Sequence, residues 1–229
     1  MNVGQSLQHS LERQRAGALK FLQQPALGRA WGGPMNGQRW RCLMFAELVH
    51  KTAPKAIIET GTYLGTTTEW LAAFQLPVFT CEADPENFGF AKARLGATPN
   101  VRVLPADSRA FLTQLLRGPL GAGPNLFYLD AHWNDDLPLA QELEIIFGRS
   151  LDSVVVIDDF EVPGDPGYGF DDYGAGKALT AAYISGVAER FKLSAYYPIT
   201  PSTDETGALR GCVVLAHRTL NGVSLLRRS

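Results

Sequence analysis

Residues 56–74, AIIETGTYLGTTTEWLAAF, are the stretch of the sequence that decides the fold. A short apolar run leads into a turn with two glycines, and the turn leads into a helix-like segment that begins with three threonines. Such strand–turn–helix units build parallel sheets that are covered by helices. Because ligands of these sheets bind beyond the carboxyl ends of the strands, we ask what this turn holds.

The same alternation runs along the rest of the chain. Seven strand-like runs occur at 56–59, 78–81, 101–104, 126–129, 154–157, 193–197 and 212–216. The first five are almost continuously apolar, as expected of parallel strands that are buried on both faces. The last two have the pattern of a closing antiparallel hairpin, and residues 6–24 and 37–54 have helical periodicity. We therefore predict an α/β fold with a seven-stranded, mostly parallel sheet, helices on both faces and a C-terminal antiparallel hairpin.

Composition describes one globular domain, because 229 residues with 45% hydrophobic content can bury a substantial core. We expect a single domain over residues 1–229, in which residues 1–54 form an N-terminal helical cap segment. The formal net charge of -2 gives no basic excess, so nucleic acid is not an expected partner. A compact ligand is the better expectation.

The expected location is cytoplasmic, without membrane contact. No apolar run approaches the roughly 18 residues that a spanning helix needs, and the polar N-terminus lacks the apolar centre of a secretory signal. Cys42, Cys81 and Cys212 are an odd number at no metal-ligand spacing, which fits a reducing compartment.

Acidic residues follow the first five strand-like runs. They are Glu59, Glu82, Asp84, Asp107, Asp130, Asp158 and Asp159. Helix capping explains Asp84, which precedes a proline, and also fits Asp107. The whole set would repel itself in one crevice, so we expect a cation or a hydroxyl-rich ligand between its members.

The opening turn is poorly suited to a pyrophosphate. The dinucleotide signature G-x-G-x-x-G needs a third glycine, whereas Gly61 and Gly65 enclose the bulky Tyr63 and Leu64. In addition, no Lys or Arg occurs in residues 56–91 to neutralise a phosphate. The turn therefore favours an uncharged or positively charged ligand.

Three motifs carry a resemblance to a known family. IIETGTYLGTTT resembles the first motif of the class I S-adenosylmethionine-dependent methyltransferases, VFTCEADPENFGFAKARL resembles the second, and VRVLPADSRAFL resembles the third. The resemblance implies a Rossmann-like sheet and S-adenosylmethionine as the cofactor. It implies that Glu82 binds both ribose hydroxyls, that Asp107 and Ser108 meet the adenine edge, and that Gly61 and Gly65 let the backbone lie against the cofactor. The full cofactor set that it implies is Asn36, Glu59, Gly61, Thr62, Tyr63, Gly65, Thr67, Glu82, Ala83, Asp107, Ser108 and Asp130.

Within this class the chain is similar to the metal-dependent catechol O-methyltransferase type and to the macrocin O-methyltransferase type. The similarity lies in GPMNGQ (33–38), FYLDAHWNDDLP (127–138) and VVVIDDFEVPGDPG (154–167). It implies a Mg²⁺ site of Asp130, Asp158 and Asp159, and a substrate pocket with Trp133 and Pro163 in its walls. Mg²⁺ prefers carboxylate oxygens and keeps waters that a hydroxylated acceptor can displace, although the Asp158–Asp159 pair also fits a solvated strand end. The implied acceptor is a small hydroxylated molecule, either a sugar unit or a catechol-like diol.

The general base departs from the catechol type, in which a lysine follows the tryptophan. Asn134 stands at that place here, so His132 is the nearest titratable substitute and, with Asp130, forms our predicted catalytic pair. The inserted Ala131 could turn His132 away. Asp135, Asp136 or metal activation alone are the alternatives that we keep open.

The sequence leaves alternatives open for the function, for one loop and for the first 30 residues. A metal-independent small-molecule methyltransferase and a catalytically weak cofactor-binding subunit are the two rival functions. The segment after residue 161 reads as a lid, in which Tyr168, Phe170 or Tyr173 either line the pocket or only fasten the loop. The first 30 residues are either a cap helix or the contact of a homodimer.

Overall fold

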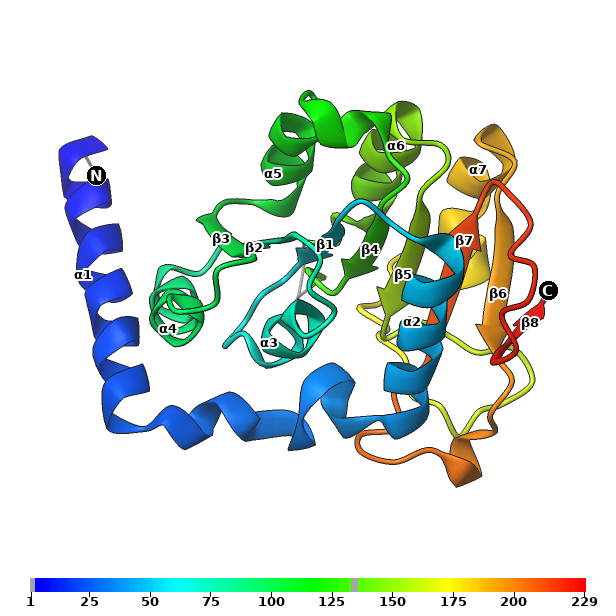
Figure 1. Ribbon diagram of the computed structural model, residues 1–229, viewed down its shortest axis with the longest axis horizontal. Helices are drawn as coiled ribbons and strands as arrows, with labels where there is room; N and C mark the ends of the chain where they lie inside the picture. The colour runs from blue at the N-terminus through cyan, green and yellow to red at the C-terminus, as the bar shows by residue number, and fades with distance from the viewer. Residues whose placement is uncertain (1–2, 133–135) are drawn as a thin grey trace.

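The computed structural model describes residues 3–132 and 136–229, which contain one mixed eight-stranded sheet (Figure 1). Its strands are β1 (Ile57–Thr60), β2 (Val78–Glu82), β3 (Val101–Pro105), β4 (Leu126–Leu129), β5 (Val154–Asp158), β6 (Ser194–Pro198), β7 (Cys212–Ala216) and β8 (Leu226–Arg228). Their order across the sheet is β3-β2-β1-β4-β5-β7-β6-β8. The pairs among β1 to β5 are parallel, whereas β7 is antiparallel to both β5 and β6. The predicted Rossmann-like sheet and its C-terminal hairpin are therefore confirmed.

The strand β8 was not predicted. It has three residues, two of them arginines, and it pairs with the edge of β6. A short, charged edge strand has no apolar alternation for a sequence pattern to detect.

Helices cover both faces of the sheet, as predicted. Alternate strand residues divide into two cores, because successive side chains point to opposite faces. One core joins Ile57, Tyr128 and Val156 to α2 (Arg39–Thr52) and α3 (Thr66–Ala72). The other joins the opposite faces of the same strands to α5 (Ser108–Leu115), α6 (Leu139–Arg149) and α7 (Ala181–Arg190).

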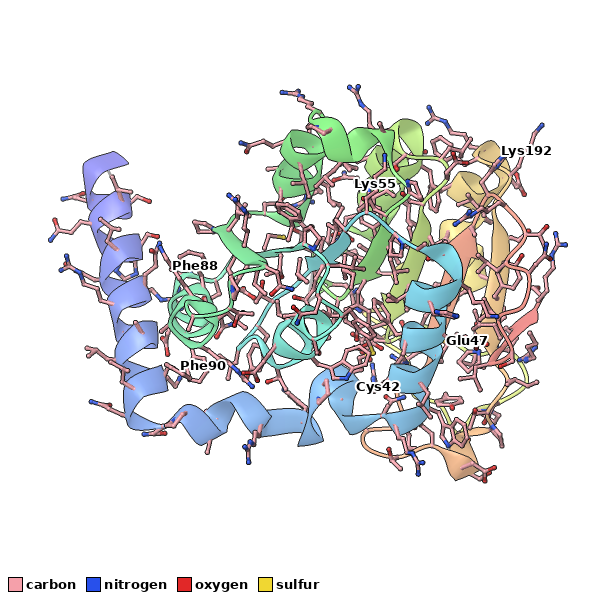
Figure 2. All side chains as sticks on the ribbon, viewed as in Figure 1. Cys42, Glu47, Lys55, Phe88, Phe90 and Lys192 are labelled. Atoms are coloured by element: carbon pink, nitrogen blue, oxygen red, sulfur yellow. The ribbon has the colours of Figure 1, made fainter. Side chains whose placement is uncertain are left out.

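The N-terminal segment runs around the outside of the sheet. The helix α1 (Val3–Gln23) stands at one edge of the molecule against α4 (Pro85–Leu95), and two short 3₁₀ helices, η1 (Pro25–Gly32) and η2 (Pro34–Gly37), lead from it to α2 (Figure 1). Phe21 of α1 meets Phe90 of α4 edge to face, with 5.3 Å between ring centroids; Figure 2 labels Phe90 on α4. The segment thus reaches from one end of the sheet to the other.

Two observations bear on the environment of the chain. All three cysteines are free thiols, including Cys42, which Figure 2 places on α2. Among the described residues, no helix combines the length and the apolar character that crossing a membrane requires.

The order in which the chain adds strands reverses between β1 and β4, and the site lies at this point. From β1 the chain moves outward through β2 and β3, then returns to the other side of β1 through β4 and β5. Thr60 at the end of β1 pairs with Cys81 on one side and with Leu129 on the other. Crossovers that leave in opposite directions open a crevice at the carboxyl ends of such strands.

Candidate active site

A cavity of about 830 Å³ opens at the carboxyl ends of the parallel strands. Its wall comes from η1, from the turn after β1, from the ends of β2 to β5, and from the loop before β7. The carboxylates in the described part of this wall are Glu82, Asp84, Asp107, Asp130, Asp136, Asp159 and Asp171. The basic side chains there are those of Arg210 and of His132, so the cavity is strongly acidic.

The turn after β1 is held by its own backbone and by β4. Gly61 has φ +85°, and a Cβ at this position would lie 2.2 Å from the carbonyl oxygen of Asp130, so no other residue fits. The Thr62 hydroxyl is 2.6 Å from the Thr80 hydroxyl, and the amide of Tyr63 donates to Glu82 at 2.7 Å. The turn thereby brings the ends of three strands to one cavity wall.

Glu82 is the carboxylate best placed to meet a diol. Its Oε2 accepts from the amide of Tyr63, and its Oε1 accepts from the amide of Asp84 at 2.8 Å. Burial raises the pKa of this carboxyl, while the amide donors favour its charged form. Since a carboxylate has about four acceptor sites, Glu82 is fixed in orientation and can still accept hydroxyl donors from the cavity.

Asp107 and Ser108 lie farther along the same wall. Asp107 caps α5, because its Oδ1 accepts from the amides of Arg109 and Ala110 at 2.9 and 3.3 Å. The Arg109 guanidinium binds both Asp107 and Asp136, at 2.6 and 2.8 Å, and lowers the pKa of Asp107. We call the wall formed by the turn after β1 and the ends of β2 and β3 the cofactor end of the cavity.

Two of the predicted cofactor residues lie outside the cavity wall. Glu59 is 1% exposed and accepts from the hydroxyls of Thr68 and Thr80 at 2.5 and 2.6 Å, and burial raises its pKa to about 7. A Cβ at Gly65 would lie 2.9 Å from the Leu95 side chain, so this glycine allows the turn to pack on α4. Both residues support the turn from behind. The other predicted cofactor residues line the cavity: Asn36, Gly61, Thr62, Tyr63, Thr67, Glu82, Ala83, Asp107, Ser108 and Asp130.

Asp158 lies apart from the carboxylates with which it was grouped. It is fully buried, forms an ion pair with Arg41 of α2, and accepts from the Tyr128 hydroxyl. The Asn36 side-chain amide donates to Asp158 Oδ2, the oxygen that also accepts from Tyr128, at 3.3 Å. Asp158 belongs to the same alternation as Val154 and Val156, so its side chain points to the α2 face rather than into the cavity.

Asp130, His132 and Asp159 form the group that faces the cavity together. His132 Nε2 is 3.9 Å from Asp130 Oδ1 and 4.0 Å from Asp159 Oδ2, and the three ligand atoms lie within 4.8 Å of one another. Asp159 reaches this position through a left-handed backbone conformation with φ 52° directly after β5. We call this group the metal end of the cavity. His132 therefore stands where the sequence had placed Asp158.

Electrostatics at the metal end favour a bound cation. Burial and the neighbouring Asp158 carboxylate raise the pKa of Asp130 well above its usual value and that of Asp159 to about 7. Burial lowers the pKa of His132, so its imidazole is neutral at pH 7 and has a free lone pair. A divalent ion would reverse the effect on the carboxylates, because it stabilises their charged forms.

The sequence had not indicated Arg210, Asp171 or Arg41. Arg210 Nε donates to Asp159 Oδ1 at 2.5 Å, and the same guanidinium binds Asp171. One signal was present: Arg210 stands just before a strand of the antiparallel hairpin, which begins beside the end of β5. Arg41 lies among apolar residues of a helix and gave no comparable signal.

The predicted substrate wall is only partly described. Trp133, like Asn134 and Asp135, lies outside the described residues. Pro163 is exposed and lies outside the cavity wall, where its carbonyl accepts from Arg227 at 2.6 Å. In the segment predicted to be a lid, Tyr168 is buried and its hydroxyl donates to the carbonyl of Thr200 at 3.1 Å, whereas the Tyr173 hydroxyl donates to the carbonyl of His132 at 3.2 Å.

The comparisons with known proteins agree with this architecture. No family model matches the chain, and no curated protein matches it by sequence. Among solved structures it is similar to a putative O-methyltransferase from Klebsiella pneumoniae, with 21% identity over 77% of this chain and 79% of that one, at a TM-score of 0.51. It is similar to the O-methyltransferase TomG from Streptomyces achromogenes, solved with S-adenosylmethionine, with 20% identity, 76% and 78% coverage and a TM-score of 0.51. For a putative caffeoyl-CoA O-methyltransferase from Staphylococcus aureus, identity is 15%, coverage is 77% and 82%, and the TM-score is 0.55. The chain thus has the fold of the S-adenosylmethionine-dependent O-methyltransferases.

Proposed function

We propose that the chain is an S-adenosylmethionine-dependent O-methyltransferase that acts on a small hydroxylated molecule with the help of a divalent cation. The observation that carries this proposal is that one cavity contains a carboxylate suited to a diol and a separate group of carboxylates suited to a cation. Glu82 at the cofactor end offers a fixed carboxylate to a diol, and Asp130 and Asp159 at the metal end face the same space. The cavity volume of about 830 Å³ is in the range of small-molecule sites, roughly 300–1,000 Å³.

Charge supports the methyl donor that the sequence motifs imply. The sulfonium of S-adenosylmethionine is a cation, and the carboxylates of the described wall far outnumber its guanidinium. A phosphate-rich cofactor would be repelled by the same groups. Glu82 would take the ribose hydroxyls as charge-assisted hydrogen bonds, and Ala83, Asp107 and Ser108 would border the adenine.

The reaction needs an acceptor oxygen in line with the sulfonium methyl. A divalent ion at the metal end would lower the pKa of an acceptor hydroxyl and so supply the oxyanion nucleophile. Asp130 and Asp159 would hold that ion, and Mg²⁺ is the ion that the sequence motifs imply. The chain would contribute chiefly position, by holding donor and acceptor at the two ends of one cavity.

Turnover with a panel of acceptors tests this function. Purified protein would be incubated with S-adenosylmethionine, a divalent ion, and catechols or sugars with neighbouring hydroxyls, and S-adenosylhomocysteine would be measured. We expect product with at least one class of diol, loss of turnover with a chelator, and loss with Asp130→Asn.

A matched control is Asp152→Asn, which alters an exposed carboxylate in the turn before β5. Turnover that survives the chelator would instead support a metal-independent methyltransferase. Cofactor binding without transfer to any acceptor in a single turnover would support a cofactor-binding subunit.

A further inference from the structure

His132 is an unusual residue for the wall of an acidic cavity. Its side chain is 1% exposed, and within the described chain neither of its ring nitrogens has a hydrogen-bond partner. Leaving a buried polar group without a partner is costly, and native structures rarely do so without a reason. Because Nε2 points toward two carboxylates at 3.9 and 4.0 Å, a cation that all three groups bind would supply the missing partner.

The carboxylates around His132 carry more negative charge than the neighbouring guanidinium groups neutralise. Asp158 is compensated by Arg41, so it adds little to the balance. The guanidinium of Arg210 pairs with Asp159 and Asp171, and within the described residues Asp130 has no guanidinium partner. When all three carboxylates are ionised, two negative charges remain uncompensated, which matches one divalent ion.

Geometry permits the three groups to bind one ion. Ligands about 2.0–2.1 Å from an octahedral ion lie about 3 Å from each other when adjacent. The observed separations of 3.9 Å, 4.0 Å and at most 4.8 Å therefore require the groups to close by about 1–2 Å. Arg210 binds Asp159 Oδ1, so Oδ2, which faces His132 Nε2, would be free to bind an ion.

We propose that Asp130 Oδ1, His132 Nε2 and Asp159 Oδ2 form a mixed nitrogen–oxygen metal site that prefers a first-row transition ion to Mg²⁺. Imidazole is a good ligand for Co²⁺, Zn²⁺ and Fe²⁺, whereas Mg²⁺ prefers oxygen ligands. The place of the ion in catalysis rests on the proposed function, but its binding does not. As a ligand, His132 would not be free to act as the general base, and a bound ion would supply Lewis-acid chemistry at this end of the cavity.

Calorimetric titration of the metal-free protein with CoCl₂ and with MgCl₂ tests the proposal. We expect Co²⁺ to bind at least about 100-fold more tightly than Mg²⁺. His132→Gln replaces the nitrogen by an amide oxygen, so Co²⁺ should bind at least about tenfold more weakly while Mg²⁺ affinity changes little. The control is His50→Gln, which makes the same change at an exposed position of α2 and should alter neither affinity.

Pulsed electron paramagnetic resonance adds a readout on the wild-type protein that does not require the variant to fold. Mn²⁺ bound to the wild-type protein should show coupling to one ¹⁴N nucleus, and His132→Gln should lose it. Equal affinities for Co²⁺ and Mg²⁺, or a wild-type Mn²⁺ spectrum without nitrogen coupling, would overturn the proposal. Nitrogen coupling without methyl transfer would keep the site and remove the proposed function, whereas methyl transfer with Mg²⁺ and no nitrogen coupling would do the opposite.

Discussion

The two ends of the cavity are built in different ways. At the cofactor end, Asp107 caps its own helix, and Glu82 accepts the amide of Asp84, two residues away, and that of Tyr63, 19 residues away. At the metal end, partners come from distant segments: Arg210 pairs with Asp159, and Arg41 pairs with the buried Asp158 that precedes Asp159. Residues close in the sequence therefore hold much of the cofactor end in place. The metal end depends on tertiary contacts, and His132 there keeps unused ligand capacity.

The largest expected effect tests the tertiary support of the metal end. Arg41→Met leaves the fully buried Asp158 without its counter-charge, which should lower the free energy of unfolding by about 3–5 kcal/mol. Urea unfolding followed by circular dichroism measures this loss. The control is Arg39→Met on the exposed side of the same helix, which should stay within about 0.5 kcal/mol of wild type. Equal stability of the two variants would contradict a stabilising role of the Arg41–Asp158 pair.

The next effect concerns the acid behind the turn. Because the pKa of Glu59 is raised from 4.5 to about 7, the folded state keeps a proton that the unfolded state loses. This contribution to stability is complete below pH 4.5 and is lost as pH rises through 7, by on the order of 3 kcal/mol. Glu59→Gln should therefore gain stability relative to wild type between pH 4 and pH 8.

Unfolding free energies at both pH values measure the Glu59 effect. Glu189→Gln at an exposed position of α7 is the control and should show no such trend. A difference between Glu59→Gln and wild type that is the same at both pH values would contradict the shifted pKa.

A smaller effect is expected for the cofactor end itself. Glu82→Ala removes the charge-assisted contact with the ribose hydroxyls, about 1.5–3 kcal/mol, so S-adenosylmethionine should bind one to two powers of ten more weakly. Calorimetry measures the affinity, and Glu86→Ala on α4 is the control, since Glu86 pairs with Lys20 of α1. Unchanged affinity would rule out the ribose role of Glu82.

The smallest effect separates capping from ligand contact at Asp107. Asp107→Ala should cost about 1 kcal/mol of stability, because α5 loses its cap, whereas Asp107→Ser keeps a cap and should cost less. Thermal unfolding compares the two variants. If both bind S-adenosylmethionine as wild type does, Asp107 serves the helix and not the adenine edge.

Much of the fold followed from local patterns. Five apolar runs predicted the parallel strands, and Asp84 and Asp107 marked the starts of α4 and α5, where the structure shows both capping bonds. The strand β8 escaped detection because a charged edge strand of three residues carries no periodic signal. The helix starts were predictable because each capping bond joins residues two or three apart.

The site followed less completely. Ten of the predicted cofactor residues line the cavity, whereas Glu59 and Gly65, from the same motif as Gly61 and Thr62, support it from behind. Of the predicted metal group, Asp130 and Asp159 lie together with His132, whereas Asp158 follows the alternation of β5 toward Arg41. The alternation of Val154, Val156 and Asp158 was visible in the sequence and would have given the direction of that side chain.

The sequence by itself determined the strands, the turns and the caps, because these depend on side-chain alternation and on hydrogen bonds between neighbours. It also determined that acids would gather at one edge, since the carboxyl ends of parallel strands meet there. Only the tertiary structure decided which carboxylates are paired with an arginine and which can still bind a ligand. Arg41 and Arg210 come from opposite ends of the chain, and they bind Asp158 and Asp159. A local sequence pattern cannot predict these pairs, because their partners are brought together only by the folded chain.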